Sequence, residues 1–458
     1  MNKNVLIIVV TISLILFPFL FESLTFDQQI TLGALGGALL LWFTGVISPA
    51  LVGIMVIISF LGSGVLALNI FWGILFSDIT YLLLGIFIIV AAVKESRLPQ
   101  KIISIALRHV GGNMLKLLFF APLYLLLVIP DPISRITIIL PLFKKIKARL
   151  DLKKDEVRSL FSLLYIIIPY VGLASVSIYP LAAPSRLLAF HILNDYQQID
   201  LSFLDWFLLA APVMVLFIFL LYFTVKYSRN RQWKILEEKV FALKEVMKTE
   251  LLKRDKRLVY LLMAVLFLFF SRGILHNIDL GIIALFAAFL LFTPLIKYFK
   301  MRDFIPISNY PIIMLYISSL MLAEALKTTG ILTDFTDYVL SYSFLYDHRV
   351  FSLILLSLLL FIIRIIFVSN TASVTIFLPL ALNFARELGV GMTWAGMFFL
   401  MSFGVTFVLP ISWPGYLVYW QEGEYQVLRH VKWGIIVSII YLLVFYIGAF
   451  YYWPLLGI

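Results

Sequence analysis

The chain has 458 residues, of which 62% are hydrophobic and 13% are charged, and it carries a net charge of +11 without any cysteine. A soluble domain has roughly 25% charged residues, so the composition excludes an ordinary soluble protein and indicates an all-α polytopic membrane protein. The lack of cysteine excludes disulfides and thiolate metal sites. The positive charges fall in loops beside apolar segments, which is typical of cytoplasmic loops and argues against a nucleic-acid partner.

Eleven apolar segments are predicted to span the membrane, because a helix needs about 20 predominantly apolar residues to cross the hydrocarbon core. In chain order they are residues 4–21, 30–46, 48–66, 79–93, 157–193, 205–226, 257–275, 279–297, 308–326, 394–420 and 434–455. The first span lies within residues 1–29, ahead of the repeated part of the chain. No small-residue cleavage site follows it, so it is expected to be retained.

Two further apolar stretches, residues 114–149 and 350–389, are each interrupted near the middle by a polar or proline cluster. This pattern predicts two short helices joined by a turn, which is a re-entrant hairpin. Non-helical backbone is tolerated at membrane depth only where protein buries it or where it lines a cavity. Both hairpins are therefore expected to contribute to a site.

The charge of the loops predicts the orientation of the chain. Residues 144–158 and 226–257 are strongly basic and are expected in the cytoplasm, whereas acidic or neutral loops are expected outside. Counting spans between them places the N-terminus in the cytoplasm and the C-terminus outside. Within the second basic stretch, residues 227–256 have apolar residues at helical spacing. They are interpreted either as an amphipathic helix on the cytoplasmic surface or as a solvated linker.

The two predicted hairpins are similar in sequence. Aligning "LPL" at 140–142 with "LPL" at 378–380 gives an offset of 238 residues. This alignment places Asp131 opposite Ser369. The second hairpin therefore looks like a related copy of the first.

The similarity extends beyond the hairpins. Residues 178–190 match residues 408–420, with two prolines in each segment at an offset of 230. Residues 30–226 and 257–458 are therefore predicted to be two repeats, each with five spans and one hairpin. An odd number of spans turns the second copy upside down. Inverted repeats with broken helices at matching positions are typical of secondary transporters, whose sites lie near the membrane midplane at the breaks.

Several motifs resemble the divalent anion/sodium symporter family of the ion transporter superfamily. They are "LLWFTGVISPALVGIMVIISFLG", "LLLGIFIIVAAVKESRLPQKIISIALRHVGG" and "SNTASVTIFLPL". The resemblance covers most of the chain. It implies a scaffold domain and a moving transport domain in a homodimer that works by an elevator motion. It also implies an anionic substrate that is moved together with sodium.

In that family, a Ser-Asn-Thr motif at each hairpin turn helps to bind sodium and the substrate carboxylate. The second hairpin keeps this motif as Ser369, Asn370 and Thr371, which are predicted to bind one sodium ion and part of the substrate. Oxygen atoms at a turn suit a hard cation, and a helix N-terminus favours an anion. The alternative is that these residues only cap and close the turn.

The first hairpin departs from the family, because its Ser-Asn-Thr motif is lost. Asp131 is expected to cap the following helix and to pair with Arg135 four residues later. Arg186 stands where the family has an asparagine. Asp131, Ser134, Arg135 and Arg186 are predicted to form the other side of the substrate site. Fixed guanidinium charge would then replace a bound sodium ion; alternatively, the arginines are held by Asp131 and carbonyls or reach toward the membrane interface.

Three further side chains are candidates for the site. Arg364, in the first arm of the second hairpin, is expected either to point into the site or to pair with an acid. Glu324, near the end of a span, is a candidate proton carrier, as is Asp131; alternatively, Glu324 pairs with Lys327. Trp413 is expected to line the substrate pocket and to make it bulkier than is usual in the family.

The leading interpretation is a secondary active transporter, not an enzyme, for a small substrate with a carboxylate or another acid group. It is expected in the inner or plasma membrane, with no cofactor apart from a coupled sodium ion or proton. The alternatives are a cation/proton antiporter of the same superfamily and a membrane protein that handles a lipid-linked anionic envelope precursor. Fixed positive charge argues against the antiporter, because it repels a cation.

Overall fold

The structure, a computed structural model, describes residues 3–44, 46–110, 113–126, 129, 131–148, 154–196, 199, 201–228, 250–341, 343–366, 370–421 and 425–458. Within these ranges the chain forms helices and no strand. The helices up to residue 228 are α1 (Lys3–Leu16), η1 (Phe17–Leu20), α2 (Phe26–Thr44), α3 (Pro49–Ser63), α4 (Leu68–Leu75), α5 (Asp78–Glu95), α6 (Leu98–His109), α7 (Met114–Leu126), α8 (Pro132–Ala148), α9 (Lys154–Ala174), η2 (Ser175–Ser177), η3 (Pro180–Ala182), α10 (Pro184–His191), η4 (Ile192–Tyr196) and α11 (Phe203–Tyr227).

The second part of the chain contains a comparable series of helices. They are α13 (Lys253–Ser271), α14 (Leu280–Leu290), η5 (Met301–Asp303), α15 (Phe304–Ile307), α16 (Tyr310–Thr328), α17 (Ile331–Leu340), α18 (Ser343–Asp347), α19 (Arg349–Ile366), α20 (Asn370–Glu387), α21 (Met392–Phe403), η6 (Pro410–Ser412), α22 (Pro414–Trp420), α23 (Val427–Ile447), η7 (Gly448–Tyr452) and η8 (Trp453–Leu456). Most of the predicted amphipathic segment, residues 229–249, lies outside the described residues.

Three helical segments in the described ranges are individually long and apolar enough to cross a membrane. They are α11, α16 and the run Val427–Leu456, which begins with α23. A fourth such segment consists of α4 and α5 together, bent by 40° at their junction. Six other apolar helical segments of the described ranges are shorter, and α7, α8, α9 and α20 contain a proline, as expected around hairpins and broken spans. The chain is an all-helical polytopic membrane protein, while the number of eleven spans and the inverted relation of the repeats stay predictions.

Both predicted hairpin regions consist of two helices that pack against each other. These pairs are α7 with α8 and α19 with α20. The start of α8 follows from its sequence, because Asp131 accepts the backbone N–H of Ser134 and Pro132 occupies the first helical position. In the second pair, α19 ends at Ile366 and α20 begins at Asn370. Residues 367–369 between them lie outside the described residues.

Two predicted spans are broken at matching prolines. The first break runs from α9 through η3 to α10, and the second runs from α21 through η6 to α22. Ala183 and Trp413, which precede the helix-starting prolines, are both extended, with φ of −161° and −152°. Proline disfavours helical backbone in the residue before it, so each break is written into the sequence. The hairpins and breaks thus recur in the same order in both halves.

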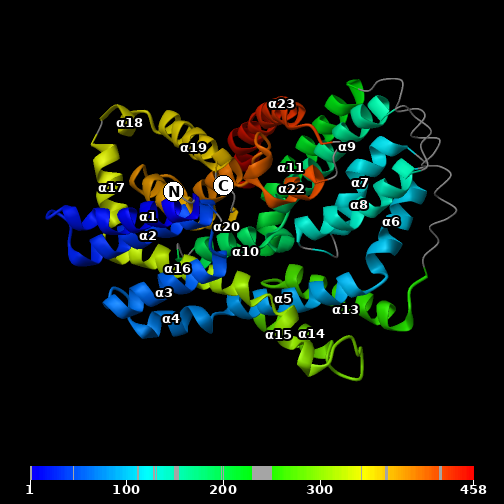
Figure 1. Cartoon of the computed structure of the whole chain (residues 1–458), viewed down its shortest axis with the longest axis horizontal. Coiled ribbons are helices and arrows are strands. Elements are labelled where there is room, and N and C mark those ends of the chain that lie inside the picture. Colours follow the sequence, from blue (N-terminus) through cyan, green and yellow to red (C-terminus); the bar gives the residue numbers. More distant parts are fainter. Residues whose placement is uncertain are drawn as a thin grey trace.

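The hairpins and broken helices meet in the middle of the molecule. Figure 1 shows α10, α20 and α22 in the centre, with α7–α9 towards one end and α1–α4 and α17 towards the other. α10 packs against α20, and α22 packs against α8 and α9, so the two halves contact each other at these elements. α5 and α16 flank this centre and also contact α10 or α20.

One helix crossing beside this centre is unusually close. A Cβ atom added to Gly85 of α5 would lie 2.5 Å from the carbonyl carbon of Ala284 of α14. The backbone N–H of Gly281 donates to Asp78 Oδ1 at 2.8 Å across the same pair. Small residues let helix backbones approach in this way. α5 and α14 are therefore held together as one rigid pair.

Five α-helices of the described ranges, α4, α6, α15, α17 and α18, were not predicted from the sequence. α4 and α6 are too short to stand out in the sequence as long apolar runs. α6 is amphipathic, with Pro99 in its first turn and apolar side chains buried on one face. α17 and α18 fall in a stretch that was interpreted as an external loop because of its acidic and polar residues. The stretch is largely helical, and its external location stays a prediction.

Candidate functional site

A cavity of about 530 Å³ lies beside the first hairpin. Its walls come from α5, from residues 306–312 before and within α16, from the start of α8, and from the break between η3 and α10. Its polar or charged lining residues are Lys94, Asp131, Ser134 and Asn309. Cavities of this size suit small molecules. The space is therefore a candidate substrate site or the route to one.

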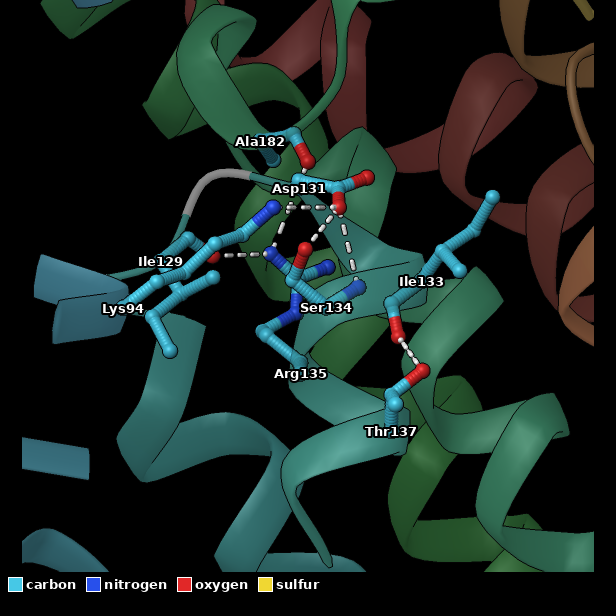
Figure 2. A network of polar contacts seen from close by, with 8 residues as sticks. All are labelled: Lys94, Ile129, Asp131, Ile133, Ser134, Arg135, Thr137 and Ala182. Carbon is cyan, nitrogen blue, oxygen red and sulfur yellow. Dashed lines mark hydrogen bonds and ion pairs between the residues drawn. The ribbon is translucent and has the colours of Figure 1, made fainter. Parts of the chain in front are cut away.

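Asp131 caps α8 at the wall of this cavity. Its Oδ2 accepts the backbone N–H of Ser134 at 2.9 Å and also the Ser134 hydroxyl. The ammonium of Lys94 lies 3.9 Å from the same oxygen (Figure 2). Asp131 and Arg135, which lie four residues apart where they can pair, form no ion pair within 4 Å in the described part of the chain, although the negative charge of Asp131 still acts on Arg135. The carboxylate instead contacts the backbone N–H and hydroxyl of Ser134 and the ammonium of Lys94, and the Lys94 contact was not predicted from the sequence.

Arg135 is fully buried and donates to neutral oxygens of the first hairpin and of the first break. Nη1 donates to the carbonyls of Ile129, at 2.8 Å, and of Ala182, at 3.5 Å (Figure 2). Nη2 donates to the Gly172 carbonyl at 3.3 Å and to the Ser175 hydroxyl at 3.0 Å. The guanidinium therefore bridges the hairpin turn, the end of α9 and the η3 break. This agrees with the interpretation in which carbonyls hold Arg135.

Arg186 lies on α10, immediately after the same break, and is also fully buried. Its Nη2 donates to the Ser177 hydroxyl at 3.1 Å and to the Gly404 carbonyl at 2.8 Å. Nε and Nη1 have no hydrogen-bond partner among the described residues. Unsatisfied buried donors are uncommon and call for an explanation. Arg186 therefore connects the first half of the chain to the end of α21. Its Nε and Nη1 remain available to donate to a ligand.

Arg364 is 1% exposed and lies near the end of α19. Its Nε donates to Asn370 Oδ1 at 3.0 Å, Nη2 donates to the same oxygen, and Nη1 donates to the Ser412 carbonyl at 3.2 Å. Arg364 and Arg186 are close enough for their charges to repel each other. These contacts bring Arg364 to the second break, and its role in a substrate site stays a prediction.

The predicted Ser-Asn-Thr site is described in part. Ser369 lies outside the described residues. Asn370 and Thr371 are partly exposed at the start of α20, and the Thr371 carbonyl accepts the Thr375 hydroxyl at 3.0 Å. The role of these residues in binding sodium stays a prediction.

Aromatic side chains fill the second break. Trp413 is buried and packs edge to face on Tyr416, with ring centroids 5.2 Å apart. The Tyr416 hydroxyl donates to the Thr406 carbonyl at 2.9 Å, and the Tyr419 hydroxyl donates to the Ile136 carbonyl of α8 at 2.8 Å. These rings make the second break bulky and tie it to the first hairpin. A role of Trp413 in substrate binding stays a prediction.

Glu324 lies apart from the arginines, in a smaller cavity of about 190 Å³. The cavity is lined by residues of α4, α10 and η4, α16 and α20, including His191 and Lys327. Glu324 is partly exposed there. A role of Glu324 as a proton carrier stays a prediction. Six of the predicted site residues lie around the two breaks, namely Asp131, Ser134, Arg135, Arg186, Arg364 and Asn370. Glu324 instead lies in the separate cavity that α10 and α16 help to line.

Comparison with known proteins agrees with this picture. The description "Sodium:sulfate symporter transmembrane region" belongs to the family whose sequence model matches residues 1–458. An "Uncharacterized transporter" of Haemophilus influenzae is 24% identical over 403 residues, covering 82% of each chain. A "Membrane protein" of Cupriavidus necator is 23% identical over 380 residues, covering 80% of this chain and 73% of the relative. The chain therefore belongs to the sodium:sulfate symporter family, the divalent anion/sodium symporters that its motifs resemble.

Proposed function

We propose that the protein is a secondary active transporter of a small anion with a carboxylate, sulfate or similar acid group. The observation that carries this proposal is the buried positive charge at the two helix breaks. Arg135 and Arg186 are fully buried, and neither has a carboxylate within 4 Å among the described residues. Arg364 adds a third buried guanidinium, at the second break.

Burying a charge costs several kcal/mol per ion unless a partner of opposite charge compensates it. Ionisable residues inside a membrane protein therefore mark substrate or ion pathways. An anion that reaches the breaks would supply the missing negative charge, and the free Nε and Nη1 of Arg186 would donate to it. Guanidinium groups favour planar acid groups, because two N–H donors match two oxygens. A cation/proton antiporter would meet repulsion at the same place.

The position of the cavity beside the first hairpin supports a proposal for how the substrate moves. This cavity lies between α5 and α16 on one side and the start of α8 with the η3 break on the other. We propose that the hairpins and broken helices move as a transport domain against the remaining helices, in the elevator manner, within a homodimer. The two inverted repeats would expose this cavity alternately to the two sides of the cell membrane.

The coupling ion is not fixed by this proposal. The family description names sodium, and one ion is predicted at Ser369, Asn370 and Thr371. A proton carried by Glu324 or Asp131 is the other candidate. The orientation with a cytoplasmic N-terminus and an external C-terminus remains part of the proposal, as does the boundary between the repeats at residues 227–256.

Counterflow in proteoliposomes tests the proposal. Proteoliposomes that contain the purified protein are loaded with unlabelled sulfate, phosphate or succinate. Uptake of the same anion in labelled form is then measured. At least one anion should give protein-dependent counterflow, and Arg186→Gln should lower it. Arg302→Gln, at an exposed arginine, serves as the control and should match wild type. Protein that accumulates none of a broad anion panel, but exchanges labelled cations for protons, would contradict anion transport.

A further inference from the structure

Arg135 and Arg364 donate to carbonyl oxygens at equivalent positions of the two repeats. The offset of 230 residues between the breaks places Ala182 opposite Ser412. Ala182 is the last residue of η3, and Ser412 is the last residue of η6. Arg135 Nη1 donates to the Ala182 carbonyl, and Arg364 Nη1 donates to the Ser412 carbonyl. The same corner of each break thus holds one guanidinium.

The two arginines reach these corners from different places in the repeat. Arg135 lies on α8, the second helix of the first hairpin, and Arg364 lies on α19, the first helix of the second. By the offset of 238 residues, Arg135 matches Ser373 and Arg364 matches Leu126. The positions of the charges are therefore not a copied sequence feature. A guanidinium stands at both corners even though the repeats supply it from different helices.

Each guanidinium has the oxygen-rich surroundings that suit a small cation. Among the described residues, the contacts of Arg135 include three carbonyls and one hydroxyl, and those of Arg364 include one amide oxygen and one carbonyl. Sodium in secondary transporters is coordinated by unwound backbone carbonyls at discontinuous helices. In this chain those oxygens already accept from a covalently attached cation. Asn370, a predicted sodium ligand, is one of them.

A sodium ion would compete poorly for these corners. A second unit positive charge about 4 Å away would bind about a thousandfold more weakly, at the effective dielectric of roughly 20 that describes protein sites. Displacing the guanidinium would leave a buried arginine without its acceptors, which is also unfavourable. The neighbouring Arg186 adds further positive charge on the side of Arg364.

We infer that Arg135 and Arg364 take the place of both coupling sodium ions, so that anion binding and transport by this protein do not depend on sodium. The part of this inference that concerns anion transport rests on the proposed function. The absence of bound sodium is a separate property and does not depend on it. It also departs from the sodium named in the description of the family. Coupling then falls to a proton or to a second anion.

Direct sodium binding tests the inference without any substrate. Purified wild-type protein is titrated with ²²Na⁺ at constant ionic strength, with choline as the replacing cation. We expect no saturable sodium binding. Saturable binding of one or two sodium ions per chain to wild type would overturn the inference. This result does not depend on whether the protein transports anions, so the two proposals can fail separately.

The second arm uses labelled sulfate, phosphate and succinate in sodium or choline buffer. A coupled ion changes the affinity of its partner by about 5- to 150-fold. The anion that binds should show less than about a fivefold difference between the two buffers. A larger preference for sodium buffer would contradict the inference. Binding of none of the anions would instead count against the proposed function and leave the ²²Na⁺ result to decide.

Variants test whether Arg364 occupies a cation position. Arg364→Ser removes the charge and releases the oxygens of Asn370 and Ser412, so folded variant protein should gain saturable ²²Na⁺ binding. Arg364→Lys keeps a positive charge and should not gain it. Folding is judged by the melting transition and the size-exclusion profile, with Arg302→Ser as the matched control. Folded Arg364→Ser protein without sodium binding would contradict the assignment of Arg364.

Discussion

Replacing Arg186 by methionine should separate protein stability from anion binding. Among the described residues, only Nη2 of this buried guanidinium has hydrogen-bond partners. Removing a buried charge that has no partner of opposite charge relieves part of its desolvation penalty, which amounts to several kcal/mol per ion. Against this, the Gly404 carbonyl loses its donor at about 1–3 kcal/mol, whereas the Ser177 hydroxyl can rotate to another acceptor. The two terms oppose each other, so the free energy of unfolding should change by less than about 3 kcal/mol.

Anion binding should respond much more strongly to the same change. Truncating one partner of a buried, hydrogen-bonded charge pair costs about 2–5 kcal/mol. This corresponds to an increase in Kd of about 30- to 5,000-fold. Arg186→Lys keeps the charge but loses the planar fork, so its Kd should lie between those of wild type and Arg186→Met.

The assay measures both quantities on the same purified samples. The unfolding midpoint is followed by intrinsic fluorescence without anion, and Kd is obtained from the shift of that midpoint with the transported anion. Arg302→Met, at an exposed arginine, should match wild type in both. Folded Arg186→Met protein that binds the anion within about threefold of the wild-type Kd would refute the reasoning.

Three further substitutions test other parts of the structure through the unfolding midpoint. Asp131→Ala should lower the free energy of unfolding by about 0.5–2 kcal/mol, because it removes the cap from α8, whereas Asp131→Asn caps as well and should restore it. Gly85→Leu should destabilise by at least about 3 kcal/mol, since its Cβ would already lie 2.5 Å from the Ala284 backbone; a neutral result would contradict the close crossing of α5 and α14. Tyr170→Phe should cost about 1–3 kcal/mol, because its hydroxyl ties α9 to the carbonyls of Phe407 and His430 at 3.1 and 3.0 Å, and an unchanged midpoint would count against that tie.

The hairpins and breaks were predictable because they interrupt apolar runs with local signals. A proline after an extended residue marks the starts of α10 and α22, and Asp131-Pro132 marks the start of α8. The helices α4 and α6 lack such contrast, because they are too short to stand out as spans. α17 and α18 are polar enough to resemble a loop, although they form helices at the surface.

The contacts of the arginines were only partly predictable. Sequence spacing suggested Asp131 as the partner of Arg135, because the two are four residues apart on a helix. The structure instead gives Arg135 the carbonyl of Ala182, 47 residues away, and gives Asp131 the ammonium of Lys94. Local spacing cannot weigh a helix cap against a tertiary contact. The repeat offset is the one sequence signal that relates Ala182 to Ser412, the acceptor of Arg364.

The most direct test of the account is an experimental structure of the wild-type protein with the anion that gives counterflow. We propose that buried arginines at the paired helix breaks hold a negative charge within the membrane. Density for the anion should lie within about 3 Å of Nε or Nη1 of Arg186, at hydrogen-bond distance. Anion density confined to a surface remote from both breaks, with Nε and Nη1 of Arg186 bonded only to protein atoms, would contradict the account.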